Sequence, residues 1–332
     1  MLKEEMMKTG LWIHKIILVA ILGLFTAGFI SVEEKTLLLK EDLSIGVEDG
    51  DENLIFERIS SIRLDGEDNI YILDWRKNSI VKFDSTGKFL ASIVLKRGQG
   101  PGEVVSLGHM DVSPAGRIFV HDNSRKVIVF NPEGHLLREI RHRDLQGTSI
   151  ACLGEDQIVI LGLKDNKIFH LFDMEGKRLS SFGDPFEVPP SLSKFKDMSM
   201  VKMPIRFDRS KKNTLYIINP HKNEIYAYKH QSLEKIIKGK SKWFEREEAL
   251  VTSEGNLAFL VPAVSVLEHQ NRLFITFPQR GRGVGDLTLF VNDKPIASTE
   301  IIGIPHAIDS QGRLYVAEQE NFPRVVRYIV QF

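Results

Sequence analysis

The chain of 332 residues has little cysteine and no net charge. Cys152 is its only cysteine, which excludes an intramolecular disulfide and any multi-cysteine zinc or iron–sulfur site. Its 44 Lys and Arg residues balance 44 Asp and Glu residues, so it lacks the electrostatic footprint of a dedicated nucleic-acid binder. With 42% hydrophobic and 27% charged residues, it has the composition of a globular protein, long enough for one large domain or two small ones.

One apolar run lies near the N-terminus, where residues 16–30 carry no charge. Lys8 and Lys15 precede this run, and positive charge before an apolar segment predicts a cytoplasmic N-terminus and an exported body. A bilayer needs about 20 apolar residues, whereas the core of a signal peptide needs roughly 7–15. We therefore predict a cytoplasmic n-region at 1–10 and a hydrophobic helix at 11–30, which is a signal peptide or a membrane anchor. A buried core helix is the alternative.

After a linker at 31–35, a six-residue pattern recurs through the body of the chain, from 36 to 332. The pattern is a polar residue, Ile or Leu, an aromatic residue or Val, Ile or Val, any residue, and then often Asp or Asn. Most copies are rich in β-branched and aromatic residues, which favours strands. The copies occupy residues 69–74, 117–122, 157–162, 214–219, 272–277 and 313–318.

A short apolar strand precedes several copies, and a hairpin follows them. The first hairpin strands begin at Ile80, Val127 and Ile168 and end in Asp or Asn. Asp or Asn opens a turn by bonding to its own backbone, and glycine supplies the positive φ at the end of the turn. The glycines at this last position are Gly87, Gly134 and Gly176.

Four short antiparallel strands, repeated every 40–58 residues, are the unit of a β-propeller. Six copies in the body predict a six-bladed, all-β propeller with about 50 residues per blade. The last copy lacks its outermost strand, whereas 36–46 supplies a spare strand ahead of the first full blade. We therefore predict that the N-terminal strand completes blade six and closes the ring, which leaves no long unpaired edge. The alternatives are a two-sheet sandwich and a chain of separate β domains.

The combination of a short strand, the recurring pattern and the F-D-x-x-G hairpin resembles the NHL-type six-bladed propellers. The segment Arg97-GQGPGEV resembles the GPGE-containing loop of a bacterial propeller family found in exported proteins, although Val104 stands where that family usually has Phe. The resemblance covers about 36–332. It implies the fold and no particular activity, because this fold serves binding proteins and enzymes alike.

The glycine-rich loop contains three candidate ligand-binding residues, Arg97, Gln99 and Glu103. Its glycines allow close approach to the backbone, so its amides could hold an anion. The loop lacks the Lys-Ser/Thr ending of a P-loop, and a purely structural crossover between blades is the favoured interpretation. A second loop, 281–286, repeats the pattern loosely and makes Arg282 a further candidate.

Two histidines, His109 and His306, lie near the start of innermost strands and are candidate ligands in the central channel. When the repeats are aligned, the two residues are one position out of register and should point differently. Zinc needs three or four protein ligands, so we predict no zinc site and no cofactor. Asp74 and Asp122 end the repeated strand. They could bind calcium, but we expect them to cap the following turns.

Charge is unevenly distributed along the chain. Residues 194–242 contain 13 basic and 4 acidic side chains, whereas 41–57 contains seven acidic side chains and no basic ones. A basic sector attracts anionic partners such as lipid headgroups or acidic glycans, although a solvated outer face is the simpler interpretation.

No nucleophile, general base or metal set is recognisable in the sequence. We therefore predict an extracytoplasmic, monomeric propeller that is a non-catalytic scaffold for a protein or glycan partner, associated with the membrane through its N-terminal segment. The alternative is a calcium-assisted, lactonase-like hydrolase that uses carboxylates in the channel. A third possibility is a structural module held by its anchor near a larger envelope assembly.

Overall fold

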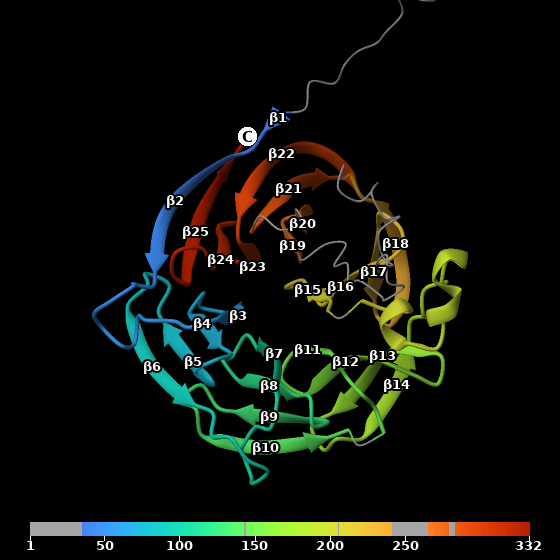
Figure 1. Cartoon of the computed structure of the whole chain (residues 1–332), viewed down its shortest axis with the longest axis horizontal. Coiled ribbons are helices and arrows are strands. Elements are labelled where there is room, and N and C mark those ends of the chain that lie inside the picture. The colour runs from blue at the N-terminus through green and yellow to red at the C-terminus, as the bar shows by residue number, and fades with distance from the viewer. Residues whose placement is uncertain (1–34, 143, 205, 241–264, 279–282) are drawn as a thin grey trace, which may run out of the picture. The chain divides into compact units, whose positions relative to one another are not determined.

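The chain folds into six antiparallel sheets arranged in a ring (Figure 1). A computed structural model describes residues 35–142, 144–204, 206–240, 265–278 and 283–332. The segment Thr36–Phe332 is one compact unit. The predicted all-β, six-bladed propeller is confirmed. The predicted hydrophobic helix at 11–30 lies outside the described residues, and within them no helix is long and apolar enough to cross a membrane.

The first three blades each contain four strands in consecutive order. Blade one consists of β3 (Ile59–Leu64), β4 (Ile70–Asp74), β5 (Ser79–Phe83) and β6 (Phe89–Val94). Blade two consists of β7 (Leu107–Val112), β8 (Ile118–Asp122), β9 (Lys126–Phe130) and β10 (Leu136–Arg141). Blade three consists of β11 (Ser149–Cys152), β12 (Gln157–Lys164), β13 (Lys167–Asp173) and β14 (Arg178–Phe182).

Two short 3₁₀ helices, η1 (Pro190–Phe195) and η2 (Ser199–Val201), separate blades three and four. Blade four consists of β15 (Asp208–Arg209), β16 (Leu215–Ile218), β17 (Glu224–Lys229) and β18 (Ser232–Lys238). Blade five consists of β19 (Ser265–His269), β20 (Arg272–Pro278), β21 (Val284–Val291) and β22 (Lys294–Ile302). Blade six consists of β23 (Ile304–Ile308), β24 (Leu314–Glu318), β25 (Arg324–Gln331) and β2 (Leu38–Ile45).

The hydrophobic core lies between adjacent blades. Every residue of β4, β8 and β24 is buried, because both faces of these strands are covered by the sheets on either side. Tyr71 of blade one packs in one cluster with Met110 and Val120 of blade two. This packing explains why the repeated pattern is a continuous apolar run, since a strand covered on both faces has no solvent side to place polar residues on.

The N-terminal strand closes the ring, as predicted. β2 pairs antiparallel with β25, from Leu38 opposite Gln331 to Ile45 opposite Val325. A short preceding strand, β1 (Lys35–Thr36), adds a fifth strand to blade five beside β22. The N-terminal segment therefore pairs with two successive blades, an extension that the sequence pattern did not predict.

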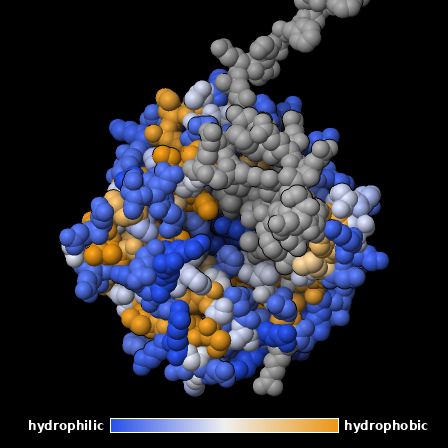
Figure 2. All heavy atoms as spheres, viewed as in Figure 1, coloured by the Kyte–Doolittle hydropathy of each residue, from blue (hydrophilic) through white to orange (hydrophobic). Residues whose placement is uncertain are grey.

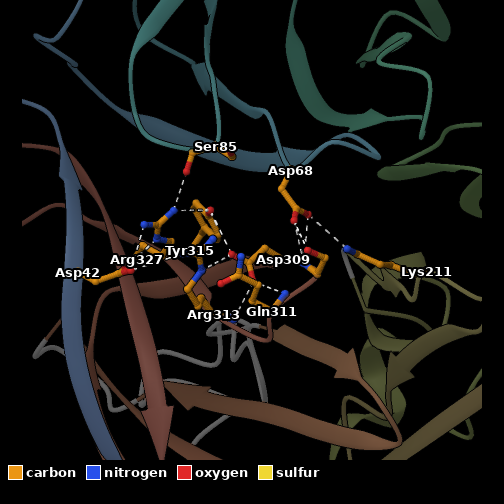
Figure 3. A network of polar contacts seen from close by, with 10 residues as sticks. Asp42, Asp68, Ser85, Lys211, Asp309, Gln311, Arg313, Tyr315 and Arg327 are labelled. Carbon is orange, nitrogen blue, oxygen red and sulfur yellow. Dashed lines mark hydrogen bonds and ion pairs between the residues drawn. The ribbon is translucent and has the colours of Figure 1, made fainter.

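An ion pair between side chains of β2 and β25 stabilises this closure. The guanidinium of Arg327 on β25 donates to both carboxylate oxygens of Asp42 on β2, at 2.8 and 3.0 Å. The same side chain donates to the carbonyl of Ser85 in blade one at 2.7 Å (Figure 3). Arg327 thus joins both strands of the closure to the neighbouring blade.

Candidate ligand site in the axial channel

The innermost strands of all six blades surround one cavity, which has a volume of about 90 Å³. Hydrophilic side chains gather at the centre of the face drawn in Figure 2. Each blade contributes the residue that pairs with the third position of its repeated pattern. These equivalent residues are Arg63, Asp111, Ala151, Asp208, Leu267 and Ala307.

Asp111 on β7 contacts residues of three other blades around the channel. One carboxylate oxygen lies 3.3 Å from Nε of Arg63 in blade one, and the other lies 3.2 Å from Nη2 of Arg209 in blade four. The backbone N–H of Cys152 donates to Asp111 at 2.9 Å, and its thiol lies at 3.2 Å. Burial would raise the pKa of Asp111, but Arg209 and Arg63 hold it below its usual value. Asp111 is therefore an ionised anchor for two guanidiniums.

A second carboxylate anchors a third guanidinium. Arg206 donates through Nη2 to Asp208 at 3.1 Å. The other oxygen of Asp208 accepts the backbone N–H of Val266, in blade five, at 2.8 Å. Nε of Arg206 is buried and has no hydrogen-bond partner among the described residues.

Both predicted channel histidines lie among these arginines. Burial, together with the positive charges of Arg206 and Arg63, lowers the pKa of His109 to about 3. The same causes lower the pKa of His306 well below its usual value, with a contribution from His109. Both imidazoles are therefore neutral at pH 7, so each can donate one hydrogen bond and accept another.

A β-bulge changes the register around His306. Pro305 pairs with Val316 and Ala307 pairs with Tyr315, so His306 is the extra residue between them. Its carbonyl accepts a hydrogen bond from Arg63 at 3.2 Å. The alignment of the repeats did not include this bulge, and it therefore separated the two histidines by one position. In the structure the two side chains share the same arginine neighbours.

The turns that follow β3, β15 and β23 lie close together (Figure 3). Asp68 of blade one accepts hydrogen bonds from the backbone N–H and the hydroxyl of Ser310 of blade six. Lys211 of blade four lies 3.4 Å from the same carboxylate and is 55% exposed. Three turns that are far apart in sequence are thus joined by polar contacts.

The predicted glycine-rich loop joins β6 to β7 and binds its own carboxylate. Nitrogen of Gly100 donates to Oε2 of Glu103 at 2.8 Å, so the side chain of Glu103 occupies the place where an external anion would meet that amide. Lys126 donates to the carbonyl of Glu103 at 2.6 Å and to Glu139 at 2.9 Å. These contacts fix the loop to blade two.

The other two predicted loop residues are exposed, and the remaining candidates fall elsewhere. Arg97 and Gln99 lie on the surface of this loop, and the loop leads into β7, which carries His109. Arg282 lies outside the described residues. The structure therefore brings together His109 and His306 but does not bring Glu103 into the channel.

The strand-end carboxylates cap the turns, as expected. Asp74 accepts four backbone N–H groups, among them that of Glu57 at 2.7 Å and that of Arg58 at 3.2 Å. Asp122 accepts the N–H groups of Val105 and Ser124. These oxygens are already occupied by amides. The described part of the chain contains no group of three His, Cys, Asp or Glu side chains that could hold a metal ion.

Sequence reasoning missed the charged residues of the channel: Arg63, Asp111, Arg206, Asp208 and Arg209. A usable signal existed for Arg63 and Asp111, because each lies the same number of residues before the start of a repeated copy. Aligning the innermost strands would have placed both at the axis. Arg206 carried no such signal, because the short β15 begins only at Asp208.

Comparison with known proteins agrees with the fold. A protein named "Putative exported protein" from Bacteroides fragilis NCTC 9343 is similar in structure, with 14% identity, a TM-score of 0.58, and coverage of 92% of this chain and 98% of that one. A member of the DUF4221 family from Bacteroides vulgatus ATCC 8482 has 12% identity and a TM-score of 0.60, with coverage of 90% and 99% respectively. No curated protein matches the chain. The family described as "Domain of unknown function (DUF4934)" matches residues 45–311, and the chain belongs to this family.

Proposed function

We propose that the protein is an extracytoplasmic, non-catalytic binding scaffold that takes a protein or glycan partner over its axial channel. The observation that carries this proposal is the state of the channel carboxylates. Asp111 and Asp208 accept arginine and backbone donors, so they hold guanidiniums in place and have little capacity for acid–base work. Preorganised donors of this kind suit recognition.

The alternative, a calcium-assisted hydrolase, finds less support in the same contacts. Calcium takes about 6–8 oxygen ligands. Asp111 has both oxygens engaged by arginines and Asp208 has its oxygens engaged by Arg206 and an amide. A cation entering the cavity would also meet the guanidiniums of Arg63 and Arg209, and like charges in a desolvated site repel strongly.

Two observations support an extracytoplasmic location. The apolar run at 16–30 follows basic residues, which is typical of export signals. A protein of similar fold is named as exported. The N-terminal segment would then be cleaved or would anchor the propeller to the membrane, and the NHL-like assignment remains a prediction based on the repeat.

The test is capture of a partner by the full-length protein in detergent, with envelope extract and a glycan panel as sources. Lys211→Glu reverses the charge of an exposed side chain that lines the channel, and we expect it to reduce capture at least about tenfold, as the loss of a charged contact does. Lys294→Glu is the matched control, because Lys294 is exposed at the start of the outer strand β22. Equal capture by both variants, or steady hydrolase turnover by the purified protein, would contradict the proposal.

A further inference from the structure

We propose that a pocket between blades three and four binds a small carboxylate with an apolar body, either a free organic acid or the C-terminal residue of a polypeptide. The pocket has a volume of about 270 Å³, close to the lower end of the range of about 300–1,000 Å³ that is typical of small-molecule sites. It shares no lining residue with the axial cavity. The inference therefore goes beyond the proposed function.

The short hairpin turn of blade four leaves room for this pocket. In blade two the corresponding turn ends in Gly134, which packs so closely against the preceding blade that a Cβ atom would lie 2.6 Å from Ile93. The turn between β17 and β18 has only two residues, His230 and Gln231, with φ of 48° and 65°. It contacts blade three through Oε1 of Gln231, which accepts the hydroxyl of Ser180 at 2.5 Å. The pocket adjoins this contact, since both turn residues line it.

Apolar and aromatic side chains form part of the pocket lining. These residues are Leu153, Leu171, Phe182, Leu215 and Tyr228. Leu153 is partly exposed and the other four are buried. A ligand that covers the remaining apolar surface gains free energy by removing that surface from water. This part of the lining favours a ligand with an apolar body over a bare inorganic anion.

Two lysines give the lining a positive charge. Lys212 and Lys229 line the pocket, and its lining residues include no acidic side chain. Of the acids in nearby turns, Asp184 pairs with Lys167 at 2.6 Å, and Asp156 is not among the lining residues. The charges of the lining therefore sum to two positive charges, and ammonium groups form strong, charge-assisted hydrogen bonds to a carboxylate.

Neutral donors accompany the lysines. Burial, followed by the effect of Asp184, raises the pKa of Tyr228 to about 12, so its hydroxyl is protonated at pH 7 and can donate a hydrogen bond. Gln157 and Asn213 also line the pocket, and an amide nitrogen donates to a carboxylate oxygen. An ionised carboxylate only accepts hydrogen bonds. It therefore matches these donors, whereas the lysines would repel a cation.

An equivalent pocket between blades four and five carries the opposite charge. Phe290 pairs with its neighbouring strand as Tyr228 does in the first pocket. The second pocket has a volume of about 310 Å³, and its charged lining residues are Lys235, Glu268 and Asp293. Lys235 pairs with Asp293 at 2.6 Å, so one negative charge is in excess. Positive charge thus distinguishes the pocket between blades three and four, and the second pocket provides an internal control.

The test is isothermal titration of the full-length protein in an uncharged detergent at constant ionic strength. The probes are hexanoate, its neutral analogue hexanamide, acetate and N-acetylphenylalanine. We expect hexanoate to bind saturably. Hexanamide, which lacks the charge, and acetate, which lacks the apolar body, should bind at least about tenfold more weakly. Hexanoate represents a free acid and N-acetylphenylalanine a C-terminal residue, so the tighter of the two identifies the source.

The double variant Lys212→Gln/Lys229→Gln removes both positive charges from the pocket. We expect it to weaken hexanoate binding at least about fivefold, because each partly solvated ion pair is worth only a modest free energy. Lys235→Gln/Lys238→Gln is the matched control, since it removes two charges from β18 of the same blade and Lys235 lines the other pocket. All four lysines reach the surface, so we expect both double variants to fold.

The inference is overturned if hexanoate does not bind the wild-type protein saturably, or if hexanamide binds as tightly as hexanoate. It is also overturned if acetate matches hexanoate, since charge alone would then account for binding, or if the two double variants bind hexanoate equally well. None of these outcomes depends on capture of a partner over the axial channel, so the two proposals are tested separately.

Discussion

At the residue scale, buried histidines are the unusual feature of this propeller. The rings of His121 and His142 stack with centroids 5.4 Å apart and an angle of 13°. Both are almost wholly buried, and neither nitrogen of His121 has a partner among the described residues. Burial, followed by the effect of His142, lowers the pKa of His121 to about 3. The fold therefore keeps this ring neutral at the expense of acid stability.

Acid should destabilise the protein through these histidines. In the unfolded chain a histidine gains a proton near pH 6.5, whereas folded His121 stays neutral until about pH 3. Between these values the unfolded state binds more protons, so the free energy of unfolding is complete above pH 6.5 and decreases as pH falls toward 3. Each such histidine contributes a slope of up to about 1.4 kcal/mol per pH unit. Urea unfolding between pH 7.5 and 4.5 measures this decrease in the free energy of unfolding.

His121→Leu isolates one of these groups. Leucine removes both unpartnered nitrogens, so we expect a shallower acid dependence by up to one proton. His135→Gln, at an exposed turn position, is the control and should leave the slope unchanged. An unchanged slope in His121→Leu would show that His121 does not contribute to the pH dependence of the free energy of unfolding.

At the element scale, the glycines of the turns meet two separate requirements, a left-handed backbone and close packing against a neighbouring blade. Gly134 has a φ of 85°, and a Cβ atom there would lie 2.6 Å from Cγ1 of Ile93 on the outer strand of blade one. Gly154 has a φ of 73°, with no atom within 4 Å of the position of its Cβ. The first turn packs against the preceding blade, whereas the second lies in open space.

Replacing both glycines by alanine separates backbone strain from packing. Gly154→Ala should cost about 1 kcal/mol of unfolding free energy, because only the left-handed backbone is affected. Gly134→Ala should cost more, by about 1–3 kcal/mol, because Ile93 must also move. Chemical denaturation of the two variants gives the difference. Equal losses would mean that the contact between blades tolerates the extra methyl group.

At the scale of the whole molecule, one N-terminal strand decides whether the ring has an edge. β2 covers β25 along its length. A chain without residues 1–46 would expose the backbone groups of β25, and an unpaired strand edge pairs readily with another chain. We expect this truncated chain to self-associate or to unfold at a lower temperature. Size-exclusion chromatography and a thermal scan measure both effects.

The control for this truncation is a chain without residues 1–34, which keeps β1 and β2. It should elute as the same species as the intact propeller and unfold at the same temperature. A monomeric, equally stable chain without 1–46 would show that closure by β2 contributes little to stability.

Local patterns in the sequence were enough to predict the blades. The repeated strand, the Asp or Asn and Gly turns, and the strand missing from the last copy are all features of short segments, and short segments set strands and turns. The closing strand could be predicted because the N-terminal spare strand and the incomplete last blade can be combined in only one way that leaves no unpaired edge.

Only the tertiary structure decided which side chains contact one another in the channel. Arg63, Asp111 and Arg209 belong to three different blades, and they meet because the ring brings their strands to one axis. The bulge at His306 shifts one side chain in a way that the repeat pattern cannot show. Strand formation depends on neighbours in sequence, whereas the contacts of a desolvated site join residues far apart in the chain, so the fold was predicted and the contacts within the channel were not.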